Sequence, residues 1–184
     1  SFAEVARERG ADAIEVFLFF LLTYDRDIRW HTCLANHRPE KLAQIMQSEA
    51  TLMSFADSGA HLRNMAFYNF PLRMLKNVRD AELRGKPIMP IEKAVWRLSG
   101  ELSGWFGLDA GLIKEGKQAD VVVIDPQRLD GSLEQVKLQP WSKGFKFERL
   151  VNGGEAARHV FIAGNAAIAH GKPVAALGKK RMGR

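Results

Sequence analysis

The sequence has one cysteine, no long apolar run and no glycine-rich phosphate-binding motif. Cys33 alone excludes an internal disulfide and gives no CxxC zinc or redox motif. The longest apolar run, residues 16–22, is far shorter than the roughly 20 residues that a membrane-spanning helix needs. The GxGxxG and GxxxxGK[ST] patterns of nucleotide-binding loops are absent. We therefore expect a reducing, cytoplasmic location and no membrane partner.

The net charge of +6 is concentrated at one end of the chain. Lys179, Lys180, Arg181 and Arg184 all lie within the last six residues. Elsewhere basic and acidic side chains alternate, which is typical of a solvated surface. We expect no nucleic-acid partner. The alternative, nucleic-acid binding through the basic tail, predicts a steep salt dependence that is lost when residues 178–184 are deleted.

Length and composition allow one or two small cores. The chain has 184 residues, of which 46% are hydrophobic. It begins at Ser1 rather than at Met, its first residues give no secretory signal, and we expect it to be cut from a longer protein. We divide it into a helix-rich segment, 1–108, a strand-rich segment, 109–177, and a tail, 178–184, that we expect to be disordered.

Capping residues predict most of the helices. Ser1 and Glu4 have capping-box spacing, which predicts a helix to Arg9 that Gly10 ends. Asp12 caps a second helix that runs to about Thr23. Further helices are expected over 39–47, over 65–84 with a break near Pro71, and from Pro90 to about 108 in two pieces. Apolar residues at helical spacing are expected to face the core, namely Ile14, Phe17, Leu18, Leu21, Leu22, Phe67, Phe70, Leu72, Leu75, Val78, Ile91, Val95, Leu98 and Leu102.

Strands are expected in both halves of the chain. Residues 28–34 and 51–55 read as strands that flank the helix 39–47, which predicts a parallel pair with a right-handed crossover. In the second half, 119–124 reads as a buried strand, and Gly164–Asn165 as the two-residue turn of a hairpin. The stretch 129–154 is polar, turn-rich and poorly predictable.

The most informative stretch is TLMSFADSGAHLR, residues 51–63. Asp57 follows the expected strand 51–55, and the small residues 58–60 turn the chain behind it. A carboxylate at the carboxyl end of a strand lies where α/β enzymes place their chemistry. The alternative is an ordinary turn former or helix cap.

Two motifs resemble one known superfamily. FADSGAHLRNMAFYNFPLRML, residues 55–75, is similar to the strand-eight region of amidohydrolases of the D-aminoacylase and N-acyl-D-amino-acid deacylase branch. GLIKEGKQADVVVIDP, residues 111–126, resembles the return of that superfamily into its small β-sandwich. The resemblance implies an α/β fold: the C-terminal strand–helix units of an incomplete (β/α)8 TIM-like barrel over 1–108, plus sandwich strands over 109–177. Because a full barrel needs about 250 residues, we expect dimerisation or another association that covers the open barrel edge.

The resemblance also implies a reaction. Its members hydrolyse the amide bond of N-acyl-D-amino acids or related amides with zinc or another divalent metal, which lowers the pKa of a bound water. Asp57 matches the strand-eight metal ligand and general base, and His61 and Arg63 lie where substrate binds, Arg63 as a partner for a carboxylate. The other metal ligands have no match, since the sequence contains no His-x-His. We expect the chain alone to be inactive, and the alternative is a non-catalytic binding or assembly module.

Other candidate side chains have structural interpretations. His31 and His37 flank the end of the expected strand 28–34 and are expected to be structural, and Cys33 is expected to be buried rather than reactive. The residues of the strand-rich segment that are expected to serve the sheet and its turns are His159, His170, Asp120 and Asp125.

Overall fold

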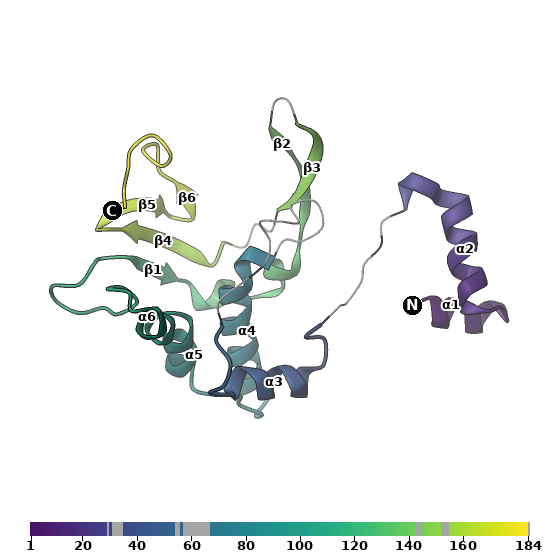
Figure 1. Cartoon of the computed structure of the whole chain (residues 1–184), viewed down its shortest axis with the longest axis horizontal. Coiled ribbons are helices and arrows are strands. Elements are labelled where there is room, and N and C mark those ends of the chain that lie inside the picture. Colours follow the sequence, from purple (N-terminus) through teal and green to yellow (C-terminus); the bar gives the residue numbers. More distant parts are fainter. Residues whose placement is uncertain are drawn as a thin grey trace. The chain divides into compact units, whose positions relative to one another are not determined.

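The structure is a computed structural model, which describes residues 1–28, 30, 35–53, 56, 67–142, 145–151 and 155–183 (Figure 1). It divides into two compact units, Ser1–Leu42 and Ala43–Arg184, and the boundary falls within the helix α3 (Pro39–Gln47). Within the described ranges, no helix is both long enough and apolar enough to cross a membrane.

Unit 1 is a helical hairpin of α1 (Phe2–Arg9) and α2 (Ala13–Tyr24), followed by a 3₁₀ turn, η1 (Asp25–Asp27). The expected caps are confirmed: Ser1 and Glu4 form a capping box, and Asp12 accepts a hydrogen bond from the Ile14 amide at 2.8 Å. Gly10 adopts the left-handed conformation that ends α1 and lets the chain reverse.

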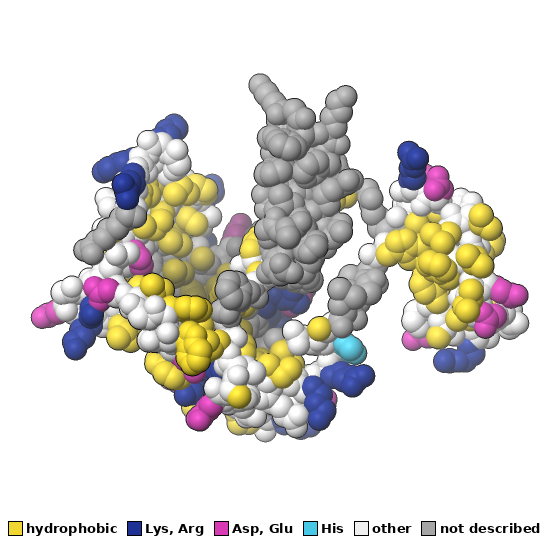
Figure 2. All heavy atoms as spheres, in the orientation of Figure 1, with side chains coloured by type: hydrophobic (Ala, Val, Ile, Leu, Met, Phe, Trp, Pro, Cys, Tyr) yellow, Lys and Arg dark blue, Asp and Glu magenta, His cyan; other side chains and the backbone are white. Residues whose placement is uncertain are grey.

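The apolar stripe expected to be buried on α2 is largely exposed. Ile14 and Leu22 are 68% and 86% exposed, whereas Val16 is buried. The reason is that α2 is apolar on nearly every side, while α1 and Trp30, which pack on it among the described residues of unit 1, cover part of its surface. The Phe2 ring centroid lies 5.4 Å from that of Phe17 and 5.3 Å from that of Trp30. Figure 2 shows the apolar side chains that remain on the surface of this hairpin.

The helices of unit 2 are α4 (Phe70–Leu83), α5 (Ile91–Leu98) and α6 (Gly100–Phe106), after a 3₁₀ turn, η2 (Phe67–Asn69). The break expected near Pro71 is the start of α4, because Pro71 lies in its first turn, where no amide partner is needed. Leu75 and Val78 are buried, as expected. On α5 the expected stripe is right in part: Ile91 and Leu98 are half-buried, but Val95 is exposed, and the fully buried residues are Ala94 and Arg97.

The main sheet is antiparallel, with the order β1-β4-β5-β6. Its strands are β1 (Val121–Ile124), β4 (Ala157–Ile162), β5 (Asn165–Ala169) and β6 (Lys172–Pro173). The β4–β5 turn is Ala163–Gly164, one residue earlier than expected, and both residues have positive φ. Asp120 holds this turn by accepting from the Ala163 amide at 2.7 Å, which confirms its expected role.

One expectation about the strand-rich half was wrong. The strand β1 is not buried, since Val122 and Val123 are exposed on its two faces. The poorly predictable stretch 129–154 contains an antiparallel hairpin of β2 (Lys137–Ser142) and β3 (Phe145–Val151). Two 3₁₀ turns precede that hairpin, η3 (Pro126–Arg128), which Asp125 caps as expected, and η4 (Gly131–Glu134). Residues 178–183 contain no helix or strand.

The expected parallel strands are not present in their described parts. Ile28, Trp30 and Thr51–Met53 have no strand conformation, and the two sheets of the described chain are both antiparallel. The remaining residues of 28–34 and 51–55 lie outside the described ranges. The barrel-like arrangement of residues 1–108 therefore stays a prediction.

Candidate functional site

The residues predicted to carry the chemistry, Asp57, His61 and Arg63, lie outside the described residues. The same holds for His31 and Cys33. The structure does describe the two flanks of the Asp57 segment, residues 48–53 before it and residues 67–70 after it. Both flanks belong to unit 2, and each is tied to the helical framework by polar side chains.

The upstream flank begins where α3 ends. The Thr51 hydroxyl donates to the carbonyl oxygens of Ile45, at 2.8 Å, and Ser48, at 3.1 Å. These carbonyls belong to the last turn of α3 and the residue after it, where helix carbonyls lack an intrahelical partner. Thr51 therefore folds the chain back against the end of the helix, six residues before Asp57.

Arg97 secures the same flank from α5. Its side chain is almost fully buried, with 1% of the residue exposed. The guanidinium donates through Nη1 to the Met46 carbonyl and through Nη2 to the Thr51 carbonyl. A cation at the C-terminal end of α3 also interacts favourably with the helix dipole. The fork geometry of arginine thus joins α5, the end of α3 and the approach to Asp57.

Glu101 neutralises this buried charge. Its Oε2 accepts from Arg97 Nε at 2.9 Å, and the Glu101 side chain is 16% exposed. The two residues are four apart, but α5 ends at Leu98 and α6 begins at Gly100, so the pair also connects two helices. A buried charge is stable only when it is paired and hydrogen-bonded, and here all three nitrogen atoms of the guanidinium have acceptors.

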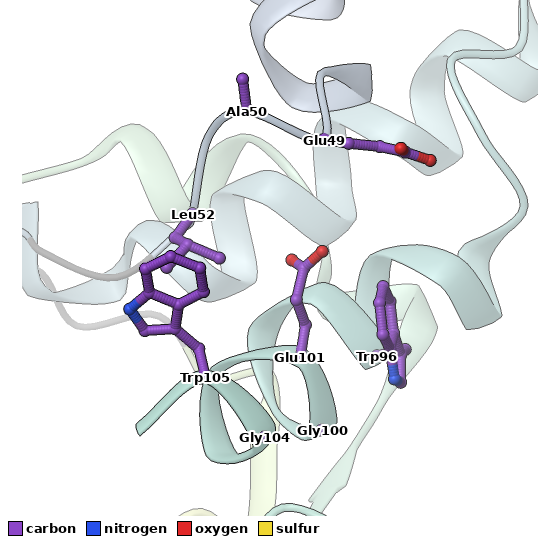
Figure 3. Close-up of a pocket in the computed structure, with 8 residues that line it drawn as sticks. All are labelled: Glu49, Ala50, Leu52, Trp96, Gly100, Glu101, Gly104 and Trp105. Carbon is purple, nitrogen blue, oxygen red and sulfur yellow. The ribbon is translucent and has the colours of Figure 1, made fainter. Parts of the chain in front are cut away.

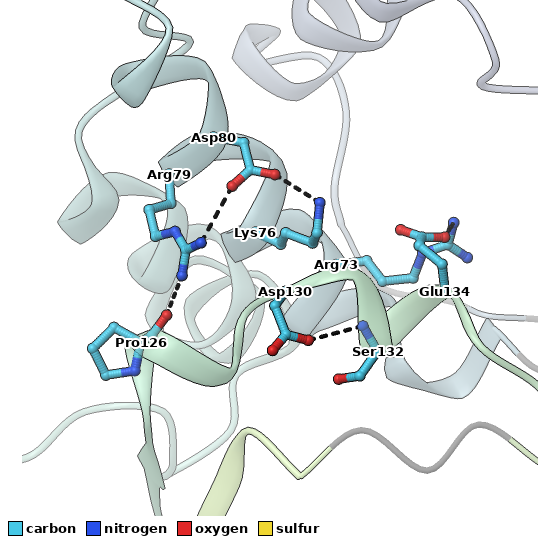
Figure 4. A network of polar contacts seen from close by, with 8 residues as sticks. All are labelled: Arg73, Lys76, Arg79, Asp80, Pro126, Asp130, Ser132 and Glu134. Carbon is cyan, nitrogen blue, oxygen red and sulfur yellow. Dashed lines mark hydrogen bonds and ion pairs between the residues drawn. The ribbon is translucent and has the colours of Figure 1, made fainter.

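The downstream flank is held at the start of α4. Asn69, the N-cap residue, is buried and donates through Nδ2 to the Leu133 carbonyl at 3.0 Å. Two arginines of α4 extend this contact, because Arg73 pairs with Glu134 at 2.6 Å and Arg79 donates to the Pro126 carbonyl (Figure 4). The segment 126–134 therefore packs on α4. The first of these contacts is made by Asn69, three residues after the undescribed stretch 57–66.

Hydrogen bonds to the Asp130 carboxylate stabilise the turn η4 in the segment 126–134. The hydroxyl and the amide of Ser132 donate to the Asp130 carboxylate, the amide at 2.8 Å, and lower the pKa of Asp130 below its usual value. Asp130 thereby caps η4, which presents the Leu133 carbonyl to Asn69.

A cavity of about 770 Å³ lies beside the upstream flank (Figure 3). The residues that line it are Glu49, Ala50, Leu52, Trp96, Gly100, Glu101, Gly104 and Trp105. In the view of Figure 3, the Glu101 carboxylate points up between the two indole rings, which come from α5 and α6. None of the predicted site residues lines this cavity.

The described residues contain no group of three or more His, Cys, Asp or Glu side chains that could hold a metal ion. Asp57, the one predicted metal ligand, lies outside that search. Of the histidines, His37 is exposed outside the helices of unit 1. His159 of β4 and His170, in the turn between β5 and β6, lie edge to face with ring centroids 4.8 Å apart, which fits the structural role expected of them.

Sequence reasoning missed Arg97, Glu101 and the two tryptophans Trp96 and Trp105. One signal points to the first two, an arginine inside the apolar pattern of 91–102 with a glutamate four residues later, but such pairs ordinarily lie on the surface of a helix. The backbone carbonyls that Arg97 binds give no sequence signal, because any residue carries one.

Three mycobacterial proteins are similar to this chain: Uncharacterized protein Mb2937c of Mycobacterium bovis, and Uncharacterized protein MT2981 and Uncharacterized protein Rv2913c of Mycobacterium tuberculosis. Each is 46% identical to it over 159 residues, which are 85% of this chain and 26% of the relative. The chain thus spans about a quarter of the length of these relatives. No protein-family profile and no solved structure matches it.

Proposed function

We propose that this chain is the C-terminal part of a metal-dependent amidohydrolase that cleaves the amide bond of N-acyl-D-amino acids or related amides. Such an enzyme is a hydrolase of non-peptide C–N bonds. The observation that supports the proposal is that the described residues on either side of the FADSG motif are held by polar side chains, Thr51 before it by Arg97 and Asn69 after it through the Leu133 carbonyl. Reactive residues are commonly carried on loops whose ends a rigid framework fixes.

The chemistry that this chain supplies in the proposal is proton transfer and substrate binding. Asp57 accepts the proton of the attacking water, since a carboxylate ionised at neutral pH can act as a general base. Arg63 binds the substrate carboxylate through two parallel hydrogen bonds, and His61 contacts the substrate on the same loop. These roles make the acyl amino acid, rather than a simple amide, the expected substrate.

Zinc, or another divalent metal, belongs to the complete enzyme in this proposal. The residues of this chain do not by themselves fit a closed metal site. Asp57 is the single predicted ligand, and the described residues contain no group of three or more His, Cys, Asp or Glu side chains that could hold a metal ion. The remaining ligands then come from chain beyond these 184 residues. That fits the similar mycobacterial proteins, of which about three quarters of the length lies outside the matched region. A reducing, cytoplasmic location, suggested by the single cysteine, is part of the same proposal.

The test is the turnover of the complete protein with N-acetyl-D-amino acids. Asp57→Asn keeps the size of the side chain but removes the base, so kcat should fall at least about 100-fold, as for other general bases, with an unchanged melting temperature. Glu115→Gln, a charge change on an exposed loop residue, is the matched control and should keep full turnover. Equal turnover of Asp57→Asn and the parent protein would refute the proposed role.

A second candidate function is that of an assembly module that contains a barrel-like segment without catalysis. The exposed apolar face of α2, with Ile14 and Leu22, favours it, because such faces are rarely left in water. In this case the chain forms homodimers through α2. Sedimentation equilibrium would then show a dimer that Leu22→Lys dissociates, whereas Asp57→Ala would change neither assembly nor any turnover.

A further inference from the structure

We propose that the cavity beside α5 and α6 binds a small organic cation with an alkylammonium head group. The inference is independent of the proposed hydrolase function. The cavity is built only from described residues of unit 2, and Asp57, His61 and Arg63 are not among them.

The dimensions suit a small molecule. Ligand sites in proteins commonly have volumes of roughly 300–1,000 Å³, and this cavity has about 770 Å³. Its floor is α6, where Gly104 leaves open space, since a Cβ atom at that position would meet no atom within 4 Å. A head group can therefore approach the backbone of α6 closely.

The walls present two indole rings. Trp105 is 72% exposed, which is unusual for so large an apolar side chain and leaves its surface open to a ligand. Gly100 leaves room for Trp96, because a Cβ atom there would lie 3.0 Å from Trp96 Cδ1. Aromatic walls of this kind attract cations through the negative face of the ring.

The protein itself already places a cation on one of these rings. The Lys93 ammonium lies 4.0 Å from the centroid of the Trp96 ring. This distance is within the roughly 6 Å over which a cation–π interaction is significant. One face of the Trp96 indole is therefore already covered by an ammonium group of the protein, and a ligand cation would be bound by Trp105 and by the remaining surface of Trp96.

The charges that line the cavity have one sign. Glu49 and Glu101 contribute carboxylates, and no lysine or arginine is among the eight lining residues. Glu101 is fixed by its contact with Arg97, whose Nη1 and Nη2 donate away from it to the carbonyls of Met46 and Thr51. Glu49 lies at the rim and is exposed. Because Arg97 balances the charge of Glu101, the Glu49 carboxylate is the lining group that favours a cation over an anion.

A weakly hydrated cationic head group fits a cavity lined by indole rings and carboxylates best. An alkylammonium group loses less hydration than a metal ion when it enters the cavity, and its methyl groups can contact Leu52 and the indoles. A divalent metal ion prefers several converging oxygen ligands, which two carboxylates on separate segments do not provide. Charge complementarity together with apolar walls thus selects the organic cation.

The test is a titration of the chain with tetramethylammonium chloride, followed by the NMR signals of the tryptophan indole N–H groups. Sodium chloride at equal ionic strength and tert-butyl alcohol, a neutral molecule of the same shape, are the controls. We expect saturating shifts of the Trp96 and Trp105 signals at roughly millimolar concentration, assigned with single Trp→Leu variants. Trp30→Leu, in unit 1, should leave the binding curve unchanged.

Two variants decide the outcome. Trp105→Leu and Glu49→Gln change exposed side chains, and each should weaken binding about threefold or more. Equal shifts with tert-butyl alcohol would show an apolar cavity without preference for cations and would overturn the proposal. So would saturating shifts confined to other tryptophans, or unchanged affinity in both variants.

Discussion

Replacing Arg97 by methionine is the perturbation that tests most sharply how the upstream flank is held. Methionine keeps most of the apolar stem but removes the guanidinium. Met46 and Thr51 then lose the donor to their carbonyl oxygens, and Glu101 loses its ion pair. The expected effect is a large loss of stability of unit 2.

The size of that loss follows from burial. Removing one partner of a buried ion pair costs about 3–5 kcal/mol, and a hydrogen bond to a charged group contributes about 1.5–3 kcal/mol. Glu101 is still 16% exposed, so water compensates part of its lost pairing. We expect Arg97→Met to lower the free energy of unfolding by about 3–5 kcal/mol. Glu101→Gln leaves both carbonyl contacts in place and should cost about 1–2 kcal/mol.

The assay is urea unfolding followed by tryptophan fluorescence in a Trp30→Phe background. That background removes the tryptophan of unit 1, so the signal reports unit 2, where Trp96 neighbours Arg97 in the sequence. Arg84→Met is the matched control, because Arg84 is an exposed arginine at the end of α4. Exposed substitutions of this kind usually change stability by less than about 0.5 kcal/mol.

The reasoning would be refuted if Arg97→Met and Arg84→Met unfolded at the same urea concentration. Such a result would mean that Met46 and Thr51 find other donors at little cost, and that the segment before Asp57 is not held by α5. A large loss in Arg97→Met together with full stability in Arg84→Met supports the anchor.

Three further substitutions test α6 and two turns of unit 2. Gly111→Ala should lower the free energy of unfolding by about 2 kcal/mol or more, because Gly111 has a φ of +77° and a Cβ atom there would lie 2.3 Å from Ser103 Oγ. Gly104→Ala, in open space on α6, should raise the free energy of unfolding by about 0.5–1 kcal/mol, and both changes are measured by urea unfolding. Asp130 has a lowered pKa in the folded chain, so the stability it contributes is complete above its unfolded pKa and is lost as the pH falls through the folded value. Melting temperatures between pH 5 and pH 3 should therefore fall less in Asp130→Asn than in the parent chain, and equal falls would contradict the contribution of Ser132.

Local signals in the sequence were enough to place the helices. Capping residues such as Ser1, Glu4 and Asp12 act within one turn, so their effect does not depend on the rest of the fold. Pro71 and Pro90 likewise lie at the starts of α4 and α5, where proline is tolerated for purely local reasons.

Features that depend on tertiary contacts could not be predicted. The faces of α2 and α5 were assigned by periodicity, but which face is covered depends on the partners each helix has. The β4–β5 turn was misplaced by one residue, because Gly164 was read as the first turn residue, whereas Ala163 also adopts positive φ with its amide bound to Asp120. The hairpin of β2 and β3 contains Pro140 and several polar residues, which conceal the alternation of a strand.

In the candidate site, too, one part could be recognised from the sequence and another part could not. The motif around Asp57 was recognisable in the sequence, and its assignment as a base stays a prediction. The anchors on its two flanks were not recognisable, because Arg97 and Asn69 bind backbone carbonyls. Every residue carries a backbone carbonyl, so the sequence does not show which carbonyl a given side chain binds, and a structure is needed to identify the pair.

The most direct measurement of the central claim is the zinc content of the complete protein and of this chain, determined side by side after zinc loading and desalting. The account predicts that the complete protein retains zinc, that Asp57→Asn lowers this retention, and that residues 1–184 alone retain none. About one tightly held zinc ion in residues 1–184 alone would contradict it, because the chain would then complete a metal site without further ligands. A complete protein that holds no metal under any loading condition would contradict it as well.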